Sequence, residues 1–496
     1  MTGWQQLLHA AEQPLSAFEA ALSDPERAQN ALLMRIIAAE ADCEFGRAHG
    51  FAAICTLDDY RSAVPIRAHA DFESQISRIA DGETGVLTSS QVIAFEETGG
   101  TSSGAKLIAY TQCSLVSFRA AVLPWLADLA RRRRGVCAGR TYVSISPATR
   151  QPRVTAAGLP IGLSSEAAYL GDDLVGAFAS ILAVPPSVAA ISDVSEWRLA
   201  TLTALIECED LSFVSVWSPT FFLDLVESLP ANEAALLPRL GYPARTRLRG
   251  FLQTGGTDTS ILWPRLDTVS CWNDGSSALF AARLAALCPQ AQIAPKGLFA
   301  TEAVITFPWG GKAGCVPALT STFTEFIDKH DKAYLAHELD EGADYRVVIT
   351  THGGLYRYDM GDRVRCVGHE GRVARLVFEG RAGLTSDLVG EKLDEAFVAR
   401  ALAGLPCAAA LVPKAQPGPH YELWLDEAVD DPTHAFRVEA ALCLNPQYAY
   451  ARKIGQLGPL VPLPKPGFVA ERHLANVSAG KRLGDMKHSS LILDRA

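Results

Sequence analysis

A loop rich in glycine and hydroxyl side chains carries the clearest chemical signal. It reads E-T-G-G-T-S-S-G-A-K over residues 97–106 and lies between two apolar stretches. Its glycines let backbone N–H groups approach an anion closely, while the hydroxyls add neutral donors and Lys106 adds a positive charge. This composition indicates a binding site for a polyphosphate.

The loop matches two better-known patterns poorly. It lacks the G-K-[ST] of a Walker loop, and strand-like residues 107–110 follow it instead of a helix. Residues 100–104 satisfy G-x-S-x-G, the nucleophile elbow of serine hydrolases, but that motif needs a helix directly after it. A serine hydrolase is therefore a minor alternative, and a plain Gly/Ser surface turn is another.

Two further segments supply carboxylates. Thr301 and Glu302 end a strand-like stretch and pair a hydroxyl with a carboxylate. Mg²⁺ favours one or two carboxylate oxygens together with phosphate and water, so this pair suits a magnesium ion beside a phosphate. Asp362 follows a glycine turn in Y-R-Y-D-M-G-D (residues 356–362), where it could accept hydrogen bonds from both ribose hydroxyls. Each dipeptide is common alone, but together with the loop they favour a nucleotide site.

Composition narrows the class of protein. The 496 residues are 48% hydrophobic and 20% charged, which is typical of a globular chain of several domains. The net charge of −10 repels phosphate backbones and anionic lipids, so we expect neither a nucleic-acid nor a membrane partner. The 11 cysteines are scattered without a C-x-x-C pair, and no secretory signal is visible, which favours a reducing, cytoplasmic location.

The elements that must position these residues form an α/β pattern. Residues 1–60 have helical periodicity, and short apolar strands then alternate with helices such as 115–129 and 277–287. The predicted strands are 92–95, 107–110, 142–145, 213–217, 268–272 and 303–307. This alternation predicts an α/β fold with partly parallel, mixed sheets.

The predicted pattern of secondary structure changes twice toward the C-terminus. Close-set strands with glycine turns predict a small antiparallel lobe from about Asp344. Beyond residues 384–390, a helix beginning about Glu391, a strand at 421–425 and a helix at 435–444 predict a small, mobile α+β domain. We therefore expect a large N-terminal domain over residues 1–386 and a C-terminal lid over residues 387–496.

The order of these motifs resembles the adenylate-forming superfamily. That superfamily has a Ser/Thr/Gly-rich loop, a T-E strand end, a Y-R-x-x-G-D segment and a G-R hinge, here Gly380-Arg381, before a small C-terminal domain. More narrowly, the chain resembles the auxin-responsive-promoter family of acyl-acid amido synthetases, in its bacterial branch. Further resembling stretches are V-S-C-W-N-D-G (269–275), K-G-L-F-A-T-E-A (296–303), S-D-L-V-G-E-K (386–392) and N-P-Q-Y-A-Y-A-R (445–452).

The resemblance implies ATP and Mg²⁺ as cofactors and gives roles to individual residues. Lys487, in G-D-M-K, would be the catalytic lysine that meets the α-phosphate, and Thr301 and Glu302 would hold phosphate and the metal, with Glu302 as the metal ligand. The implied ATP contacts are Thr98, Gly99, Gly100, Thr101, Ser102, Ser103, Gly104, Lys106, Phe299, Asp362, Arg381 and Lys392.

Two positions depart from the family pattern. Leu298 stands where the superfamily has an aromatic residue stacked on adenine, so either another residue such as Phe299 stacks there or the stacking is weaker. Asp485 replaces a glutamine two residues before Lys487. Trp217, Trp263 and Trp272 match family positions, but tryptophans in apolar strands favour a core role.

The resemblance predicts an ATP-dependent acyl-acid amido synthetase that adenylates a carboxylic acid and transfers the acyl group to an amine, with release of AMP. Transfer to coenzyme A or a carrier protein, and a nucleotide-binding protein without catalysis, are the alternatives. We expect the acid pocket between residues 115–129 and 213–226, which are largely apolar and favour a hydrophobic or aromatic acid. The base for the amine is not identified; His352 is nearest in sequence, but a structural histidine is favoured.

Overall fold

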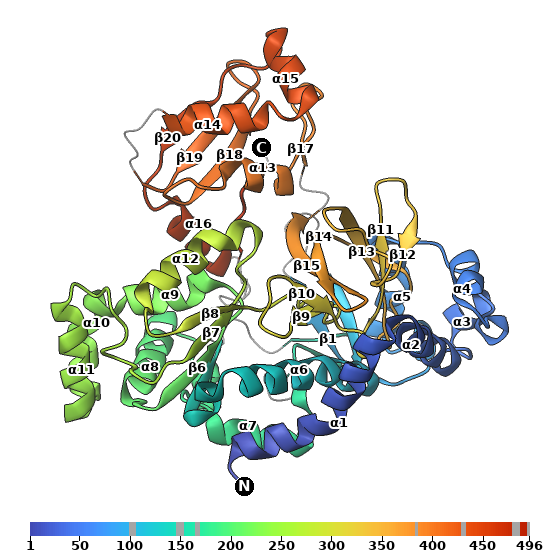
Figure 1. Cartoon of the computed structure of the whole chain (residues 1–496), viewed down its shortest axis with the longest axis horizontal. Helices are drawn as coiled ribbons and strands as arrows, with labels where there is room; N and C mark the ends of the chain where they lie inside the picture. Colours follow the sequence, from blue (N-terminus) through green and yellow to red (C-terminus); the bar gives the residue numbers. More distant parts are fainter. Residues whose placement is uncertain are drawn as a thin grey trace.

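The computed structural model describes residues 1–98, 106–144, 153–163, 169–381, 385–427, 433–478 and 487–493. Helices and sheets alternate in a mixed α/β arrangement, which confirms the predicted fold class (Figure 1). The loop residues Gly99, Gly100, Thr101, Ser102, Ser103 and Gly104 lie outside the described residues.

The N-terminal region is helical, as its periodicity predicts. Thr2 begins the first helix with a capping box, and Asp24 caps the second, which has Pro25 at its first position. The helices are α1 (Gly3–Ser23), α2 (Pro25–Ala39), α3 (Glu44–Ala48), α4 (Leu57–Ala63) and α5 (Glu73–Ala80).

A mixed sheet brackets the predicted phosphate loop. Its order is β2-β1-β5-β4, and β1, which precedes the loop, pairs antiparallel with β2, which follows it. The strands are β1 (Val92–Glu97), β2 (Leu107–Thr111), β4 (Arg153–Val154) and β5 (Pro160–Ile161). A strand after the loop, where the hydrolase elbow requires a helix, is the expected result.

Helix α6 (Gln112–Arg132) follows β2 and lies alongside α1 (Figure 1). It is long and apolar enough to cross a membrane, and it is the one such helix among the residues described. However, 61% of its apolar window is buried inside the protein, as in a core helix.

A parallel sheet, in the order β3-β6-β7-β8, occupies the next part of the chain. Its strands are β3 (Arg140–Val143), β6 (Leu211–Ser215), β7 (Thr268–Cys271) and β8 (Gln292–Pro295). The helices of this region are α7 (Asp172–Ile181), α8 (Val194–Glu207), α9 (Pro219–Glu227), α10 (Leu229–Leu236), α11 (Tyr242–Gln253) and α12 (Ala278–Leu287). In parallel sheets of this kind, ligands bind beyond the carboxyl ends of the strands.

The predicted antiparallel lobe is larger than the sequence indicated and begins earlier, at Thr306. The large antiparallel sheet has the order β12-β11-β13-β14-β15-β10-β9. Its members are β9 (Thr306–Pro308), β10 (Cys315–Pro317), β11 (Phe323–Ile327), β12 (Ala333–Tyr334), β13 (Asp344–Thr350), β14 (Tyr358–Glu370) and β15 (Val373–Arg381). The prediction missed β10 to β12 because strands of two to five residues give little periodicity, whereas β9 overlaps the predicted strand at 303–307.

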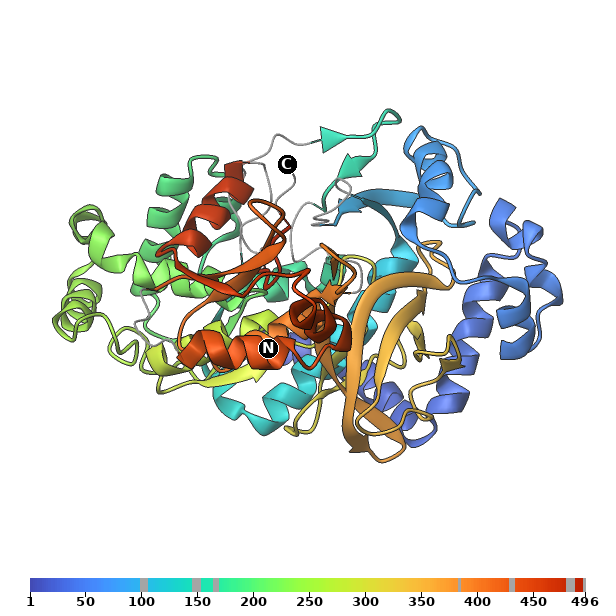
Figure 2. The ribbon, with the colours of Figure 1, turned by 90° about the horizontal axis from the view of Figure 1, so that it is seen from above.

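The C-terminal elements lie above the junction of the parallel sheet and the large antiparallel sheet (Figures 1 and 2). They are β16 (Thr385–Ser386), β17 (Leu393–Asp394), α13 (Glu395–Leu402), β18 (Ala409–Lys414), β19 (His420–Leu425), α14 (Thr433–Leu442), α15 (Pro446–Lys453), β20 (Val461–Pro464) and α16 (Phe468–Ser478). A cluster of buried apolar residues runs from Leu393 to Leu491 within them. The domain boundary at 386/387 stays a prediction.

The helix expected to begin about Glu391 begins at Glu395 instead. The Glu391 carboxylate accepts backbone N–H bonds of 2.8 Å from both Leu388 and Val389, which fixes a turn. Lys392 then has a left-handed backbone with φ of 45°. These features delay the helix, which Asp394 caps.

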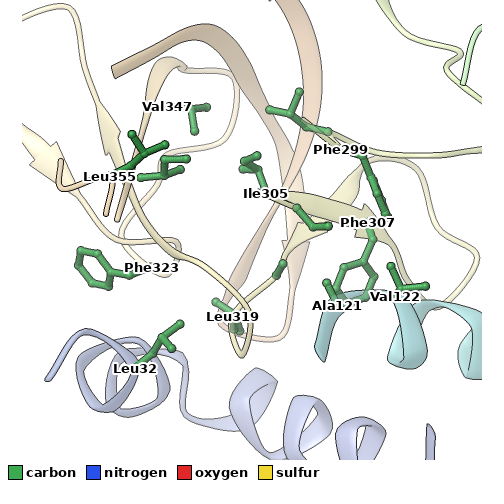
Figure 3. Close-up of a cluster of buried hydrophobic side chains, with 14 of the residues drawn as sticks. Leu32, Ala121, Val122, Phe299, Ile305, Phe307, Leu319, Phe323, Val347 and Leu355 are labelled. Carbon is green, nitrogen blue, oxygen red and sulfur yellow. The ribbon is translucent and has the colours of Figure 1, made fainter. Parts of the chain in front are cut away.

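The main apolar core lies between the N-terminal helices, α6 and the large antiparallel sheet. Leu32 of α2, Val122 of α6 and Phe307 of β9 enclose this cluster from different sides (Figure 3). Phe299, just before β9, is part of the same cluster. Four of the predicted site residues therefore follow or flank core elements that fix their backbone, namely Phe299, Thr301, Glu302 and Asp362.

Candidate active site

Charged side chains from distant parts of the chain converge beside β14. Arg381 Nε lies 3.2 Å from Asp362 Oδ1, and the Tyr358 hydroxyl donates a 3.3 Å hydrogen bond to Glu302. Lys487 and Glu302 both interact electrostatically with Asp362. We call these five residues the polar cluster; four of them were predicted from the sequence as ATP, metal or catalytic residues.

Strand pairing positions the first half of this cluster. Asp362 in β14 faces Arg381 in β15 directly across the antiparallel pair. The Arg381 side chain also donates to the Met360 carbonyl oxygen at 3.3 Å. Placing an arginine and an aspartate as cross-strand partners brings opposite charges together at a fixed distance.

Burial dominates the electrostatics of the cluster. It raises the pKa of Asp362, which is 6% exposed, and the charges of Arg381 and Lys487 oppose that rise. Burial also raises the pKa of Tyr358, so its hydroxyl stays protonated and can donate to Glu302. A buried carboxylate such as Asp362 is stabilised by further donors, and the two hydroxyls of a ribose would provide them.

The C-terminal segment places Lys487 at this cluster. Leu411 in β18 donates its N–H to the Ser490 carbonyl at 2.8 Å and accepts the N–H of Ile492 at 2.9 Å. The Ser489 hydroxyl donates a 2.5 Å hydrogen bond to Glu395 at the start of α13. The residues that follow Lys487 are thereby fixed against the C-terminal elements.

Aromatic rings support the Lys487 ammonium. Its Nζ lies 4.3 Å from the centroid of Trp272 and 5.3 Å from that of Phe378. Trp272 belongs to the segment after β7, and Phe378 belongs to β15. Lys487 therefore lies between the end of the parallel sheet and the large antiparallel sheet, with cation–π contacts to a ring from each.

The two ends of the predicted phosphate loop are close together. Thr98 donates its N–H to the Lys106 carbonyl at 2.9 Å, which continues the pairing of β1 with β2 by one residue. The buried Thr98 hydroxyl has no hydrogen-bond partner among the described residues, so it is available to a ligand oxygen. Nearby, burial and then the charge of Lys106 lower the pKa of His69, which keeps that imidazole neutral.

A hydrogen bond from strand β2 fixes the backbone of Thr301. The Tyr110 hydroxyl donates a 2.6 Å hydrogen bond to the Thr301 carbonyl oxygen. The segment reaches this point through Gly297, whose φ is 84° and where a Cβ would lie 2.3 Å from the Thr306 carbonyl oxygen. Only glycine fits there, because both the backbone conformation and the space exclude a side chain.

The structure does not bring every predicted residue into the polar cluster. Lys392 is exposed before β17 and makes no ion pair within the described part of the chain. His352 is half-buried near Arg35, and burial lowers its pKa, which suits the structural role expected. Phe299 is 7% exposed in an apolar wall, so its adenine stacking stays a prediction.

That wall belongs to an apolar cavity of about 90 Å³. Its lining comes from α1, α6, α7 and the carboxyl ends of β3, β6 and β8, between the two segments predicted for the acid pocket. The residues are Trp4, Leu7, Phe118, Val122, Trp125, Leu126, Thr141, Val143, Ser144, Leu170, Phe178, Ile181, Phe213, Ser215, Trp217, Lys296 and Phe299. Both segments predicted for the acid pocket therefore line the cavity, but the contributions of α1 and α7 were not predicted.

The tryptophans divide between core and site. Trp263 is fully buried and donates to the Leu205 carbonyl at 2.8 Å, as the core prediction requires. For Trp217 that prediction is wrong, because its ring lines the cavity. Trp217 and Trp272 lie 6.0 Å apart by ring centroids, so one tryptophan pair connects the cavity with Lys487.

The donor set is suited to a magnesium ion bound with a nucleotide. No group of three or more metal-binding side chains occurs among the described residues. Mg²⁺ commonly takes only one or two protein carboxylates and completes its shell with phosphate and water. Glu302, 9% exposed and electrostatically close to Asp362, fits such a ligand.

Comparisons with known proteins identify the family of this chain. The GH3 family N-terminal domain matches residues 14–241, and the GH3 family central domain matches residues 315–381. The putative indole-3-acetic acid-amido synthetase GH3.10 of Oryza sativa subsp. japonica is 24% identical over 432 residues, which cover 80% of this chain and 87% of that protein.

Solved structures share the whole fold. An acyl acid amido synthetase, AtGH3.15 in complex with 2,4-DB, superposes with a TM-score of 0.84 at 18% identity and covers 98% of this chain and 94% of that chain. A 2-hydroxyisobutyryl-CoA ligase in the postadenylation state gives a TM-score of 0.57 at 11% identity, over 95% and 90% of the two chains. Because its family models together span more than half of the chain, this protein belongs to the GH3 family, whose acyl acid amido synthetases are ligases that form C–N bonds through an acyl-adenylate.

Proposed function

We propose that this protein activates a carboxylic acid with ATP at the polar cluster and then transfers the acyl group to an amine. The single observation that carries the proposal is the Trp217–Trp272 pair. One ring lines the apolar cavity and the other supports Lys487, so a site for an apolar acid adjoins a site for phosphate.

In the first step, an acid oxygen attacks the α-phosphorus of ATP and pyrophosphate leaves. Lys487 offsets the charge that grows on the α-phosphoryl oxygens, and Asp362 accepts hydrogen bonds from the ribose. Arg381 stays paired with Asp362 and holds its carboxylate in place. Thr98, Lys106 and the loop between them donate to the departing phosphates. Preorganised donors of this kind are each worth about 3 to 4 kcal/mol in comparisons of variants.

Magnesium belongs to the proposal as a cofactor held by Glu302, with Thr301 beside it. When bound, the ion would neutralise charge on the phosphate oxygens. Tyr358 orients the Glu302 carboxylate toward this position through its hydrogen bond. We expect chelation of Mg²⁺ to stop adenylation while acid binding, followed by tryptophan fluorescence, persists.

In the second step, a neutral amine attacks the acyl carbon and AMP leaves. A free α-amino group titrates near pH 8, so desolvation or a modest base suffices to give the reactive form. Water hydrolyses the mixed anhydride, and the C-terminal elements above the sheets would exclude water from it. We propose amino acids or related metabolites as acceptors, since the relatives named above are amido synthetases.

We propose further that the chain comes from the bacterial branch of the family and works in the cytoplasm. The first point rests on the resemblance stated from the sequence motifs, and the unpaired cysteines support the second. The cavity volume of about 90 Å³ favours a compact acid.

The alternative is transfer of the same acyl group to a thiol, which is compatible with the fold shared with a CoA ligase. A panel of carboxylic acids crossed with amino acids and thiols separates the two, read by AMP release and product mass. We expect amides only. Thioesters as the main products would favour the ligase alternative, and ester hydrolysis without ATP would contradict both.

A further inference from the structure

The Lys296 side chain places an ammonium group in the wall of the apolar cavity. Lys296 directly follows β8 and is only 3% exposed. Its Nζ donates a 2.6 Å hydrogen bond to the Ser215 hydroxyl at the end of β6. The same Nζ lies 5.2 Å from the ring centroid of Trp125 and 5.0 Å from that of Trp217.

These four residues all line the cavity, so an occupant of the cavity lies against them. Removing an ammonium from water is costly, and a hydroxyl with two indole faces stabilises it through one hydrogen bond and cation–π contacts. An acceptor atom on the occupant would add a charge-assisted hydrogen bond, which is stronger than one between neutral groups.

The reacting carboxyl group belongs elsewhere in the site. It must meet the α-phosphorus beside Lys487, which contacts Trp272 and interacts with Asp362. Lys296 contacts Trp217, the cavity member of the tryptophan pair, and Trp125, which lies on α6. The acid therefore meets separate cations along its length, one at its reacting carboxyl group and one within its apolar body.

We propose that Lys296 is a specificity-determining residue that recognises a second hydrogen-bond acceptor on the acid. The preferred substrate class is then a compact aromatic acid bearing a hydroxyl, keto or second carboxylate group, with its ring against Trp125 and Trp217. This inference rests on the proposed function and adds the chemical class of its acid.

The test measures acid-dependent exchange of pyrophosphate into ATP for matched pairs of acids. The probes are meta- and para-hydroxybenzoate and hydroxyphenylacetate, each paired with the corresponding methyl compound, which has nearly the same size but no acceptor. For the wild-type protein we expect kcat/KM to favour at least one hydroxy acid over its methyl partner by about tenfold or more, because a site built around a polar contact rejects analogues that lack it.

The Lys296→Met variant keeps an unbranched side chain and removes the charge. We expect its hydroxy-to-methyl ratio to fall below about twofold while the methyl acids retain or gain activity. A loss of folding alone would lower both members of a pair equally and leave the ratio unchanged. Ser215→Ala removes the hydroxyl partner of Lys296 but keeps the ammonium, so the preference for the hydroxy acid should persist in this variant. If Lys296→Met does not fold, Ser215→Ala is measured in its place.

Lys332→Met is the matched control. Lys332 also lies over an aromatic ring, 4.6 Å from the centroid of Tyr334, but it is exposed and outside the cavity. Its acid preference should equal that of the wild type. Quenching of tryptophan fluorescence by the same acids provides a readout of binding without turnover, and it should show the same loss of preference in Lys296→Met.

The outcomes separate the two proposals. If the wild type exchanges pyrophosphate with no acid, the proposed function fails and this inference fails with it. If exchange occurs but methyl acids are preferred, or the ratio is the same in the wild type and Lys296→Met, then only the role of Lys296 is overturned.

Discussion

Lys487 is the residue that links the chemistry to the fold, because from the C-terminal segment it contacts Trp272 beside the parallel sheet and Phe378 in the large antiparallel sheet. We predict that Lys487→Ala lowers acid-dependent pyrophosphate exchange by about 10² to 10³-fold, as loss of one preorganised donor does. Binding of the acid, followed by tryptophan fluorescence, should be unchanged. Lys465→Ala is the control, since Lys465 lies 3.4 Å from the Trp424 centroid in the same C-terminal region. Equal losses in both variants would refute the role of Lys487.

Glu40, fully buried after α2, gives a prediction for pH dependence. Burial raises its pKa above the ordinary 4.5, against opposing hydrogen bonds from Ser89 and Thr88. The folded state then holds its proton to higher pH than the unfolded state, so this group lowers stability as pH rises through that window. Glu40→Gln should melt at a higher temperature than wild type at pH 7, with the difference shrinking toward pH 4. The exposed Glu26→Gln, in α2, should show no such trend.

At the scale of elements, the turn between β8 and β9 fixes the path of the site segment. Gly297→Ala adds a Cβ 2.3 Å from the Thr306 carbonyl oxygen at a φ of 84°. Gly371→Ala is matched in backbone conformation, with a φ of 59°, but its Cβ would meet nothing within 4 Å. We predict that Gly297→Ala lowers the free energy of unfolding in urea by at least about 2 kcal/mol more than Gly371→Ala. Similar losses would show that the close contact is relieved without cost.

Elements with strong periodicity were predictable, and short ones were not. Alternating or continuous apolar runs predicted β1, β2, β7 and α6 within a few residues of their observed bounds. The strands β10 to β12 were missed because their place is decided by pairing with distant strands, which one sequence does not display. The delayed start of α13 depends on the Glu391 hydrogen bonds, a tertiary feature that helix propensity does not contain.

At the scale of the whole molecule, motif order predicted which residues meet. Glu302, Asp362, Arg381 and Lys487 were named from separate motifs and converge in one polar cluster. Lys296 and Trp125 were not given roles, although Lys296 stands in a quoted motif, because a lysine before glycine carries no signal of burial. The available clue was a single lysine in the otherwise uncharged segment 292–300.

The central claim is that an acyl-adenylate lies on the path to the amide, and oxygen transfer tests it most directly. The acid is labelled with ¹⁸O in its carboxyl group and reacts with ATP and an amine, and the masses of the products are measured by mass spectrometry. When the carboxylate attacks the α-phosphorus and the amine then displaces AMP, one labelled oxygen remains on AMP for each amide formed. The account predicts this result. Label in inorganic phosphate with ADP as the nucleotide product, or unlabelled AMP, would contradict it.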